Sequence, residues 1–353
     1  MGNGVCTRQC NVEALPSNQT RYTAGKFTGG ATLYKKKGES SHMMEIYKTI
    51  DGRIQRIDHI EEGCWINLIT PTEEEINELV RDTGVDAGFV RAALDDEETS
   101  RTETEGNQTL IIIDLPLAQV ENGKSIFTTI PLGIIVIDKC LITVCLRENS
   151  VISEFSSGMV RSVYTNMKTR FILQILYKVA TRFLQYLKQI DRISSDIEKQ
   201  LHRSMKNKEV IQLLDLQKSL VFFSTSLKAN EITMEKILRG RIIKMYEEDQ
   251  DLMEDVLIEN KQAIEMSNIY SSILSGTMDA FASIISNNLN IVMKFLASIT
   301  IVMEVPTIIA SLYGMNVRAI PFADSPYAFL IVLVMTIIIT GLVIYALVKR
   351  NMF

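Results

Sequence analysis

The stretch IVMKFLASITIVMEVPTIIASLYGMN, residues 291–316, is apolar for most of its length and ends in a short turn, Gly314-Met315-Asn316. Beyond a connecting loop, residues 328–348 contain no charged side chain. At about 1.5 Å per residue, this second stretch is long enough to cross a hydrocarbon core of roughly 30 Å. We therefore expect it to span a membrane.

The first stretch is less hydrophobic, because it carries Lys294 and Glu304. Alternate steps of four and three residues trace a stripe that is polar or small at nearly every position. The stripe consists of Asp279, Ser283, Ser286, Asn290, Met293, Ala297, Thr300, Glu304, Thr307, Ser311 and Gly314. A polar face on an otherwise apolar helix predicts the lining of a water-filled cavity. Two helices cannot enclose a pore, so the stripe predicts a homo-oligomer with these helices around its axis.

An alternative interpretation is that the small residues allow tight helix packing in the bilayer. Packing would explain Ala297, Ser311 and Gly314. It would not explain the intramembrane carboxylate of Glu304. The pattern therefore favours pore lining.

The motif Tyr313-Gly314-Met315-Asn316 and two C-terminal apolar segments joined by a short loop resemble the CorA-type magnesium channels. Asn290, Met293-Lys294 and Pro306 also fit, and the resemblance extends from about Met43 to the C-terminus. It implies a pentameric funnel with a large cytosolic domain. Zinc-transporting members commonly have Ile where Met315 stands, so the resemblance favours Mg²⁺, with Co²⁺ as a second cargo.

Composition is consistent with a soluble domain of roughly 250 residues plus a membrane hairpin. The chain has 353 residues, 46% of them hydrophobic, and a net charge of −5, which predicts no nucleic-acid footprint. The five cysteines are Cys6, Cys10, Cys64, Cys140 and Cys145. An odd number without zinc-type spacing indicates a reducing cytosol. Cys6 and Cys10 could bind a metal, but two ligands alone are more typical of an ordinary tail.

We expect an α+β fold, in which a mixed sheet flanked by helices precedes a long stalk helix and two membrane helices. Strands are predicted at 44–49, 64–69, 110–116, 127–136 and 140–146, and a helix at 72–83 capped by Thr72 and Glu75. The predicted divisions are a variable segment (1–42), an α/β domain (43–165), a helical hairpin (166–244), a stalk (245–290), membrane helices (291–313 and 327–348), their outer loop (314–326) and a basic tail (349–353).

The helical part is exceptionally long. Residues 171–202 and 209–238 predict an antiparallel hairpin, and a third helix can continue from about Met245 past Pro306 into the membrane. The hairpin tip carries Lys199, His202, Arg203, Lys206 and Lys208, so it is basic where the family commonly has an acidic tip. That departure argues against a tip that concentrates cations.

Two acidic segments are candidates for regulation. The segment containing Asp95 and Asp96, which precedes a polar run to Gly106, is by itself typical of a solvated loop. The family resemblance implies a regulatory Mg²⁺ site between neighbouring subunits, formed by Asp96, with Asp95 beside it, and Asp255. The same resemblance places a lower acidic pore ring at Asp279. For Glu247, Glu248, Asp249 and Asp251 we expect a solvated helix N-terminus, where carboxylates favour the helix dipole.

Flanking charge predicts the orientation in a cell (inner or plasma) membrane. Lys294, Lys349 and Arg350 lie at one end of the two spans, whereas the loop offers Arg318 and Asp324. Basic ends mark the cytosolic side, so both termini are predicted inside and the Gly-Met-Asn turn outside.

The mouth of the pore is predicted to hold hydrated Mg²⁺, which gives up water reluctantly, through neutral oxygens of an Asn316 ring. Gly314 would permit close backbone approach and Met315 would brace the ring. Five Glu304 carboxylates would repel one another, so we expect a cation site there. Met293 and Asn290 would form an apolar constriction and an inner polar ring.

Several functions stay open. Zn²⁺, Ni²⁺ or Co²⁺ could be the cargo, or the chain could be a non-conducting membrane-anchored sensor or scaffold. An enzyme is not expected, because His42, His59 and His202 do not cluster in any recognisable site spacing and no phosphate-binding loop appears. The absence of a phosphate-binding loop agrees with passive conduction, which the membrane potential drives without a nucleotide.

Overall fold

The computed structural model describes residues 43–121, 124–204, 207–240, 242–316, 321, 326–350 and 352. Contacts divide the chain into residues 1–41 and residues 42–353. The predicted N-terminal segment, with Cys6 and Cys10, lies outside the described residues, as do Arg318 and Asp324. The side chains of His202, Arg203 and Lys206 at the hairpin tip also lie outside them.

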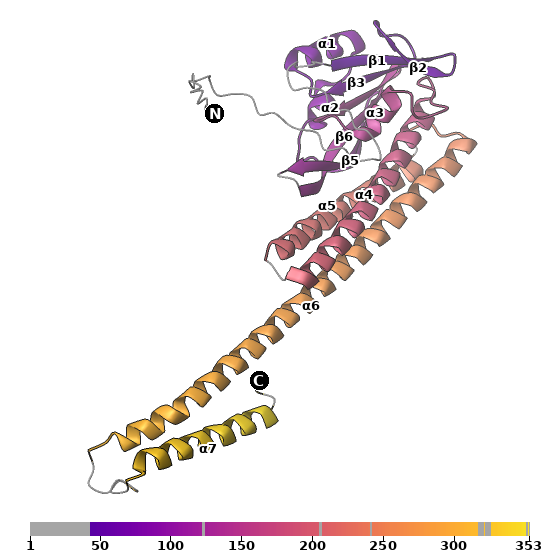
Figure 1. Cartoon of the computed structure of the whole chain (residues 1–353). Coiled ribbons are helices and arrows are strands. Elements are labelled where there is room, and N and C mark those ends of the chain that lie inside the picture. The colour runs from indigo at the N-terminus through magenta and orange to yellow at the C-terminus, as the bar shows by residue number, and fades with distance from the viewer. Residues whose placement is uncertain are drawn as a thin grey trace, which may run out of the picture. The chain divides into compact units, whose positions relative to one another are not determined.

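A seven-stranded mixed sheet forms the N-terminal half of the described chain (Figure 1). The strands are β1 (Met43–Ile50), β2 (Arg53–Ile57), β3 (Cys64–Ile69), β4 (Arg101–Glu105), β5 (Gln108–Glu121), β6 (Lys124–Val136) and β7 (Cys140–Cys145). Their order is β2-β1-β3-β7-β6-β5-β4. The β3–β7 pair is parallel and every other pair is antiparallel. The predicted mixed sheet is therefore confirmed.

The sequence prediction missed the two outermost strands. All five predicted strands are present, but β2 and β4 were not expected. The predicted solvated loop after Asp96 is wrong in its second half, because the polar run Arg101–Glu105 pairs with β5. An edge strand needs apolar residues on little of its surface, so its pattern resembles that of a loop. The turn between β1 and β2 has left-handed φ angles of 51° at Asp51 and 74° at Gly52.

Helices cover both faces of the sheet. On one face, α1 (Glu73–Thr83) and α2 (Ala87–Ala92) pack on Ile66, Leu110 and other buried residues. On the other face, Trp65 and Ile111 belong to a core shared with α3 (Ser150–Ser156) and the long helices. Neighbouring residues of one strand thus enter opposite cores, as the two-residue repeat of a strand requires. The predicted capping box of α1 is present, with Glu75 N donating to Thr72 Oγ1 and Thr72 N donating to Glu75 Oε2.

Three long helices follow, namely α4 (Lys168–Ser204), α5 (Asn207–Gly240) and α6 (Glu247–Tyr313). They pack on one another, and α6 continues without a break through Pro306, as predicted (Figure 1). At about 1.5 Å per residue, α6 is roughly 100 Å long. The last helix, α7 (Ala328–Lys349), packs on the end of α6.

The start of α6 differs from the prediction at Asp249. Glu247, Glu248 and Asp251 are exposed as expected, but Asp249 is only 4% exposed. Its carboxylate accepts a hydrogen bond of 3.1 Å from the backbone N of Tyr246. A carboxylate at the third helical position satisfies a free N–H of the helix start, which explains its burial.

A buried amide joins the hairpin to the sheet. Asn230 of α5 is fully buried, and its Oδ1 accepts hydrogen bonds of 2.8 Å from the backbone N of Asp114 and from Ser100 Oγ. Its Nδ2 donates to the Asp114 carbonyl at 2.9 Å. Because the pairing of β4 with β5 ends at Ile112, the amide takes the place of a further strand at Asp114. The contact fixes α5 against the sheet edge.

The Asp114 side chain lies in the same junction. Burial raises the pKa of Asp114, and hydrogen bonds with Ser226 and Ser100 partly offset the rise. Because the folded-state pKa lies above the unfolded value, the folded chain binds this proton more tightly than the unfolded chain. The stabilisation from protonation is complete below the unfolded pKa of about 3.9 and is lost as pH rises through the folded pKa.

We expect Asn230→Ala to lower the free energy of unfolding by about 2–4 kcal/mol, because it leaves two backbone groups of Asp114 unpaired in a buried site. The single tryptophan, Trp65, lies in the core and reports unfolding of the sheet by fluorescence in urea. Asn268→Ala, on the exposed face of α6, is the matched control and should cost less than about 0.5 kcal/mol. Equal losses for the two variants would contradict the role of Asn230.

We expect Asp114→Asn to raise the urea midpoint at pH 8, because the amide avoids burying a charge. The gain should shrink as pH falls through the raised folded-state pKa of Asp114, because the wild-type carboxyl then takes up a proton and no longer buries a charge. Asp82→Asn, which changes an exposed carboxylate on α1, is the control. A gain in the urea midpoint that grows as pH falls would contradict a raised pKa of Asp114 in the folded state.

Candidate functional site

The polar stripe of α6 faces away from α7. All ten stripe residues from Asp279 to Ser311, and Gly314 after them, are exposed. The residues of α6 that α7 buries lie on the other side, where Ser298 and Ile309 are covered. At about 100° per residue, Thr300, Glu304 and Thr307 point roughly 120–180° away from Ser298. The face that would line a cavity is thus uncovered in one chain.

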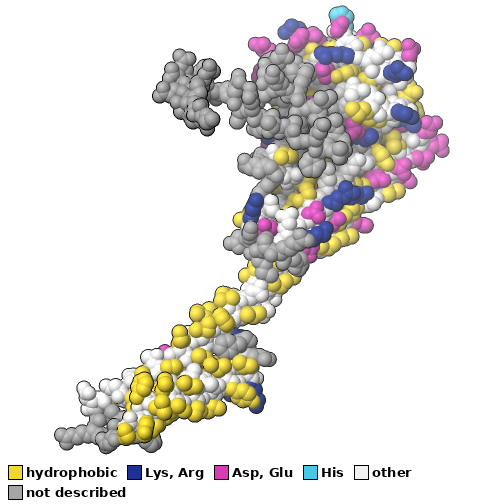
Figure 2. All heavy atoms as spheres, in the orientation of Figure 1, with side chains coloured by type: hydrophobic (Ala, Val, Ile, Leu, Met, Phe, Trp, Pro, Cys, Tyr) yellow, Lys and Arg dark blue, Asp and Glu magenta, His cyan; other side chains and the backbone are white. Residues whose placement is uncertain are grey.

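The C-terminal end of α7 lies beside the part of α6 that contains Lys294 and Ser298. Ser298 Oγ donates to the carbonyls of Lys294, at 2.8 Å, and Met352, at 2.9 Å. This contact places Lys349 and Arg350 near Lys294, so that basic residues gather at one end of the pair of helices. Figure 2 shows that hydrophobic side chains dominate the surface of α7 and the adjacent part of α6, whereas most of the charged side chains in view lie on the rest of the molecule, among hydrophobic and other side chains.

Hydroxyl groups flank Glu304 on the stripe. Thr300 Oγ1 donates to the Leu296 carbonyl at 2.9 Å, and Thr307 Oγ1 donates to the Met303 carbonyl at 3.0 Å. Their protons are therefore used within the helix, and their oxygen lone pairs remain free to accept. Glu304 is exposed and makes no hydrogen bond or ion pair with another described residue. The three side chains form an acceptor surface one to two turns long.

The turn Gly314-Met315-Asn316 directly follows α6. Gly314 caps the helix, with its N–H 2.9 Å from the Ala310 carbonyl, and a Cβ atom there would lie 3.2 Å from that oxygen. A side chain would thus be crowded at this position. Met315 is 50% exposed and Asn316 is exposed. The bracing contact predicted for Met315 stays a prediction.

The predicted regulatory residues lie on separate elements. Asp95 and Asp96 follow α2 and are exposed, and Asp95 Oδ1 accepts from the backbone N of Glu97 at 3.0 Å. Asp255 is exposed on α6. Within the described residues, no group of three or more His, Cys, Asp or Glu side chains is placed to hold a metal ion. A site that combines these carboxylates would need a second copy of the chain.

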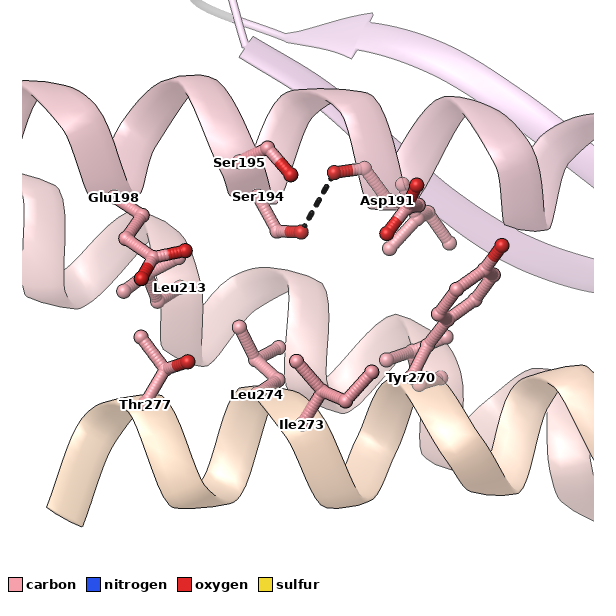
Figure 3. A pocket seen from close by; sticks show the side chains of 11 residues that line it. Asp191, Ser194, Ser195, Glu198, Leu213, Tyr270, Ile273, Leu274 and Thr277 are labelled. Carbon is pink, nitrogen blue, oxygen red and sulfur yellow. Dashed lines mark hydrogen bonds between the residues drawn. The ribbon is translucent and has the colours of Figure 1, made fainter. Parts of the chain in front are cut away.

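A small cavity between α4, α5 and α6 was not predicted from the sequence (Figure 3). Its volume is about 40 Å³, enough for a few water molecules. Asp191 and Glu198 of α4 line it opposite Tyr270 and Thr277 of α6. Burial, with Asp191 adding to it, raises the pKa of Tyr270. The seven-residue spacing of the two carboxylates, two helical turns, is the signal that could have pointed to this face.

The three described cysteines, Cys64, Cys140 and Cys145, are free and buried. Cys64 and Cys140 are direct partners in the parallel β3–β7 pair. The hydrogen bond between their thiols lowers the pKa of Cys64 and raises that of Cys140. They lie in the sheet domain, on a different part of the chain from the stripe.

Two helices are long and apolar enough to cross a membrane, Glu247–Tyr313 and Ala328–Lys349. The curated cobalt/magnesium transport protein CorA of Methanocaldococcus jannaschii is 26% identical over 290 residues, 80% of this chain and 88% of that protein. The complete structure of the CorA magnesium transporter from the same organism has a TM-score of 0.77 and 26% identity, and the match covers 86% of this chain and 97% of that one.

The full-length CmaX protein shares the fold, with a TM-score of 0.65 at 16% identity over 90% of this chain and 99% of that chain. The family described as CorA-like Mg²⁺ transporter protein matches residues 61–350. That range includes the sheet from β3 onward, the long helices and the Gly-Met-Asn turn. The chain belongs to the CorA family of magnesium and cobalt transport proteins.

Proposed function

We propose that the chain assembles as a homopentamer whose α6 helices surround a pore for Mg²⁺, with Co²⁺ as a second cargo. The observation that carries the proposal is the uncovered polar stripe on the side of α6 opposite α7. A carboxylate facing lipid is costly, so Glu304 needs a polar surrounding that one chain does not provide. A ring of α6 helices supplies it, and α7 then lies between α6 and the lipid.

Selection takes place at the Gly-Met-Asn turn. Mg²⁺ keeps its water shell, and Asn316 side-chain oxygens from five copies accept hydrogen bonds from those waters. The exposure of Asn316 in one chain supports this role. Below it, Met293 forms an apolar constriction, and Asn290 and Asp279 form polar rings toward the cytosol.

Both termini face the cytosol, because Lys294, Lys349 and Arg350 gather at the end of the spans opposite the turn. Residues 43–165 then form the cytosolic α/β domain, 166–244 the hairpin and 245–290 the stalk. An inside-negative potential drives influx, since two charges crossing 100 mV gain about 4.6 kcal/mol.

Cytosolic Mg²⁺ closes the channel by binding between Asp96, with Asp95 beside it, and Asp255 of the neighbouring subunit. Bound Mg²⁺ neutralises opposed carboxylates and stabilises the closed state, and its loss restores their repulsion. The exposure of all three side chains supports a site between subunits. The continuous α6 helix joins this site to the pore.

We expect Asn316→Ala to abolish Mg²⁺ influx into proteoliposomes under an inside-negative potential, because the ring of water acceptors is lost. Mg²⁺, Co²⁺, Ni²⁺ and Zn²⁺ are supplied in turn, and Asn268→Ala serves as the control. Wild-type flux of Zn²⁺ alone, indifferent to Asn316, would favour the competing cargo. Absence of flux for every ion in the wild type would favour a sensor or scaffold.

We expect Asp255→Lys to weaken the protection from protease that Mg²⁺ gives the cytosolic domain, since a lysine repels the ion. The readout is the rate of limited proteolysis of the full chain with and without Mg²⁺. Glu254→Lys, at the exposed neighbouring position, is the matched control. Unchanged protection in Asp255→Lys would count against this regulatory site.

A further inference from the structure

No basic side chain among the described residues lies near Glu304. Along α6, it lies about 15 Å from Lys294 and about 18 Å from Asn316. Among the described residues of the two apolar segments and their ends, the basic ones are Lys294, Lys349 and Arg350, all at the inner end. With no described basic residue beside it, the charge of Glu304 is left to a proton or to a mobile cation.

The flanking threonines favour a mobile cation over a proton as the charge that balances Glu304. Water bound to a divalent cation directs its hydrogens outward, so a wall that holds the hydrated ion must accept hydrogen bonds. Thr300 and Thr307 donate their only side-chain protons to backbone carbonyls and present oxygen lone pairs on either side of Glu304. The hydroxyl oxygens of Thr300 and Thr307 are thus already oriented to accept hydrogen bonds from the water shell of an ion.

Resting on the proposed pore, we infer that Glu304, Thr300 and Thr307 form a second cation site, below the Asn316 ring, that holds a hydrated divalent cation. The ligands are oxygens alone, which suits hard cations such as Mg²⁺. Contact through the water shell avoids the cost of removing that shell. Thr300 and Thr307 position the ion's water, and the Glu304 carboxylates supply the charge.

Such a site adds a preference for divalent over monovalent cations to the selection of hydrated ions at the Asn316 ring. A ring of neutral asparagines accepts from the water of any cation, whereas a ring of carboxylates gains more from a double charge. With divalent ions removed, the pore should pass Na⁺. A low concentration of Mg²⁺ should then block that Na⁺ flux by occupying the ring.

The test measures Na⁺ flux through the full chain in liposomes with divalent ions chelated inside, while Mg²⁺ is titrated on the side of the Gly-Met-Asn turn. Glu304→Gln should raise the Mg²⁺ concentration for half-block at least about tenfold, and Glu304→Asp should stay within about threefold of the wild type. Glu265→Gln, an exposed glutamate on the stalk part of α6, is the control and should not shift it.

Thr307→Val keeps the side-chain shape and removes one acceptor, so it should raise the half-block concentration about threefold. This variant decides the matter if Glu304→Gln does not assemble. Values for both variants within the range of the control, with Mg²⁺ influx still abolished in Asn316→Ala, would overturn the second site and leave the proposed function standing. A wild type that passes neither Mg²⁺ nor Na⁺ would overturn both.

Discussion

The packing of α7 on one face of α6 is the constraint from which the functional argument follows. Burial of Ser298 and Ile309 commits that face to contacts within the chain. The opposite face, with Glu304 between two threonines, is then left without a partner. Since an uncovered carboxylate is costly in a membrane, this face is the observation behind the proposed assembly of several copies around a pore.

The other half of α6 is held differently. Met253, Val256 and Asn260 are fully buried against the hairpin, and Asn260 Nδ2 donates to the Leu227 carbonyl at 3.0 Å. One continuous core joins Trp65 of the sheet to Phe281 of α6. Under the proposed regulation, a change in cation binding near Asp255 would reach the pore along this unbroken helix.

Much of the fold could be predicted because its signals are local. The strand at 64–69 has its predicted bounds, and the capping residues of α1 follow from four positions in sequence. Edge strands β2 and β4 were missed because one side of each lacks a partner. Asn230 could not be found either, since its partner is over a hundred residues away. The polar stripe of α6 could be predicted because its residues repeat at regular steps in the sequence. The burial of Ser298 under α7 could be seen only in the structure.

The central claim is that the stripe of α6 faces other copies of the chain. Neighbouring residues test it, because Ala297 lies on the stripe and Ser298 lies under α7. With Cys6 and Cys10 replaced by serine, Ala297→Cys and Ser298→Cys are oxidised in membranes, and covalent dimers are measured on non-reducing gels. The account predicts dimers for Ala297→Cys and monomers for Ser298→Cys. Monomers for Ala297→Cys, or dimers for Ser298→Cys alone, would contradict it.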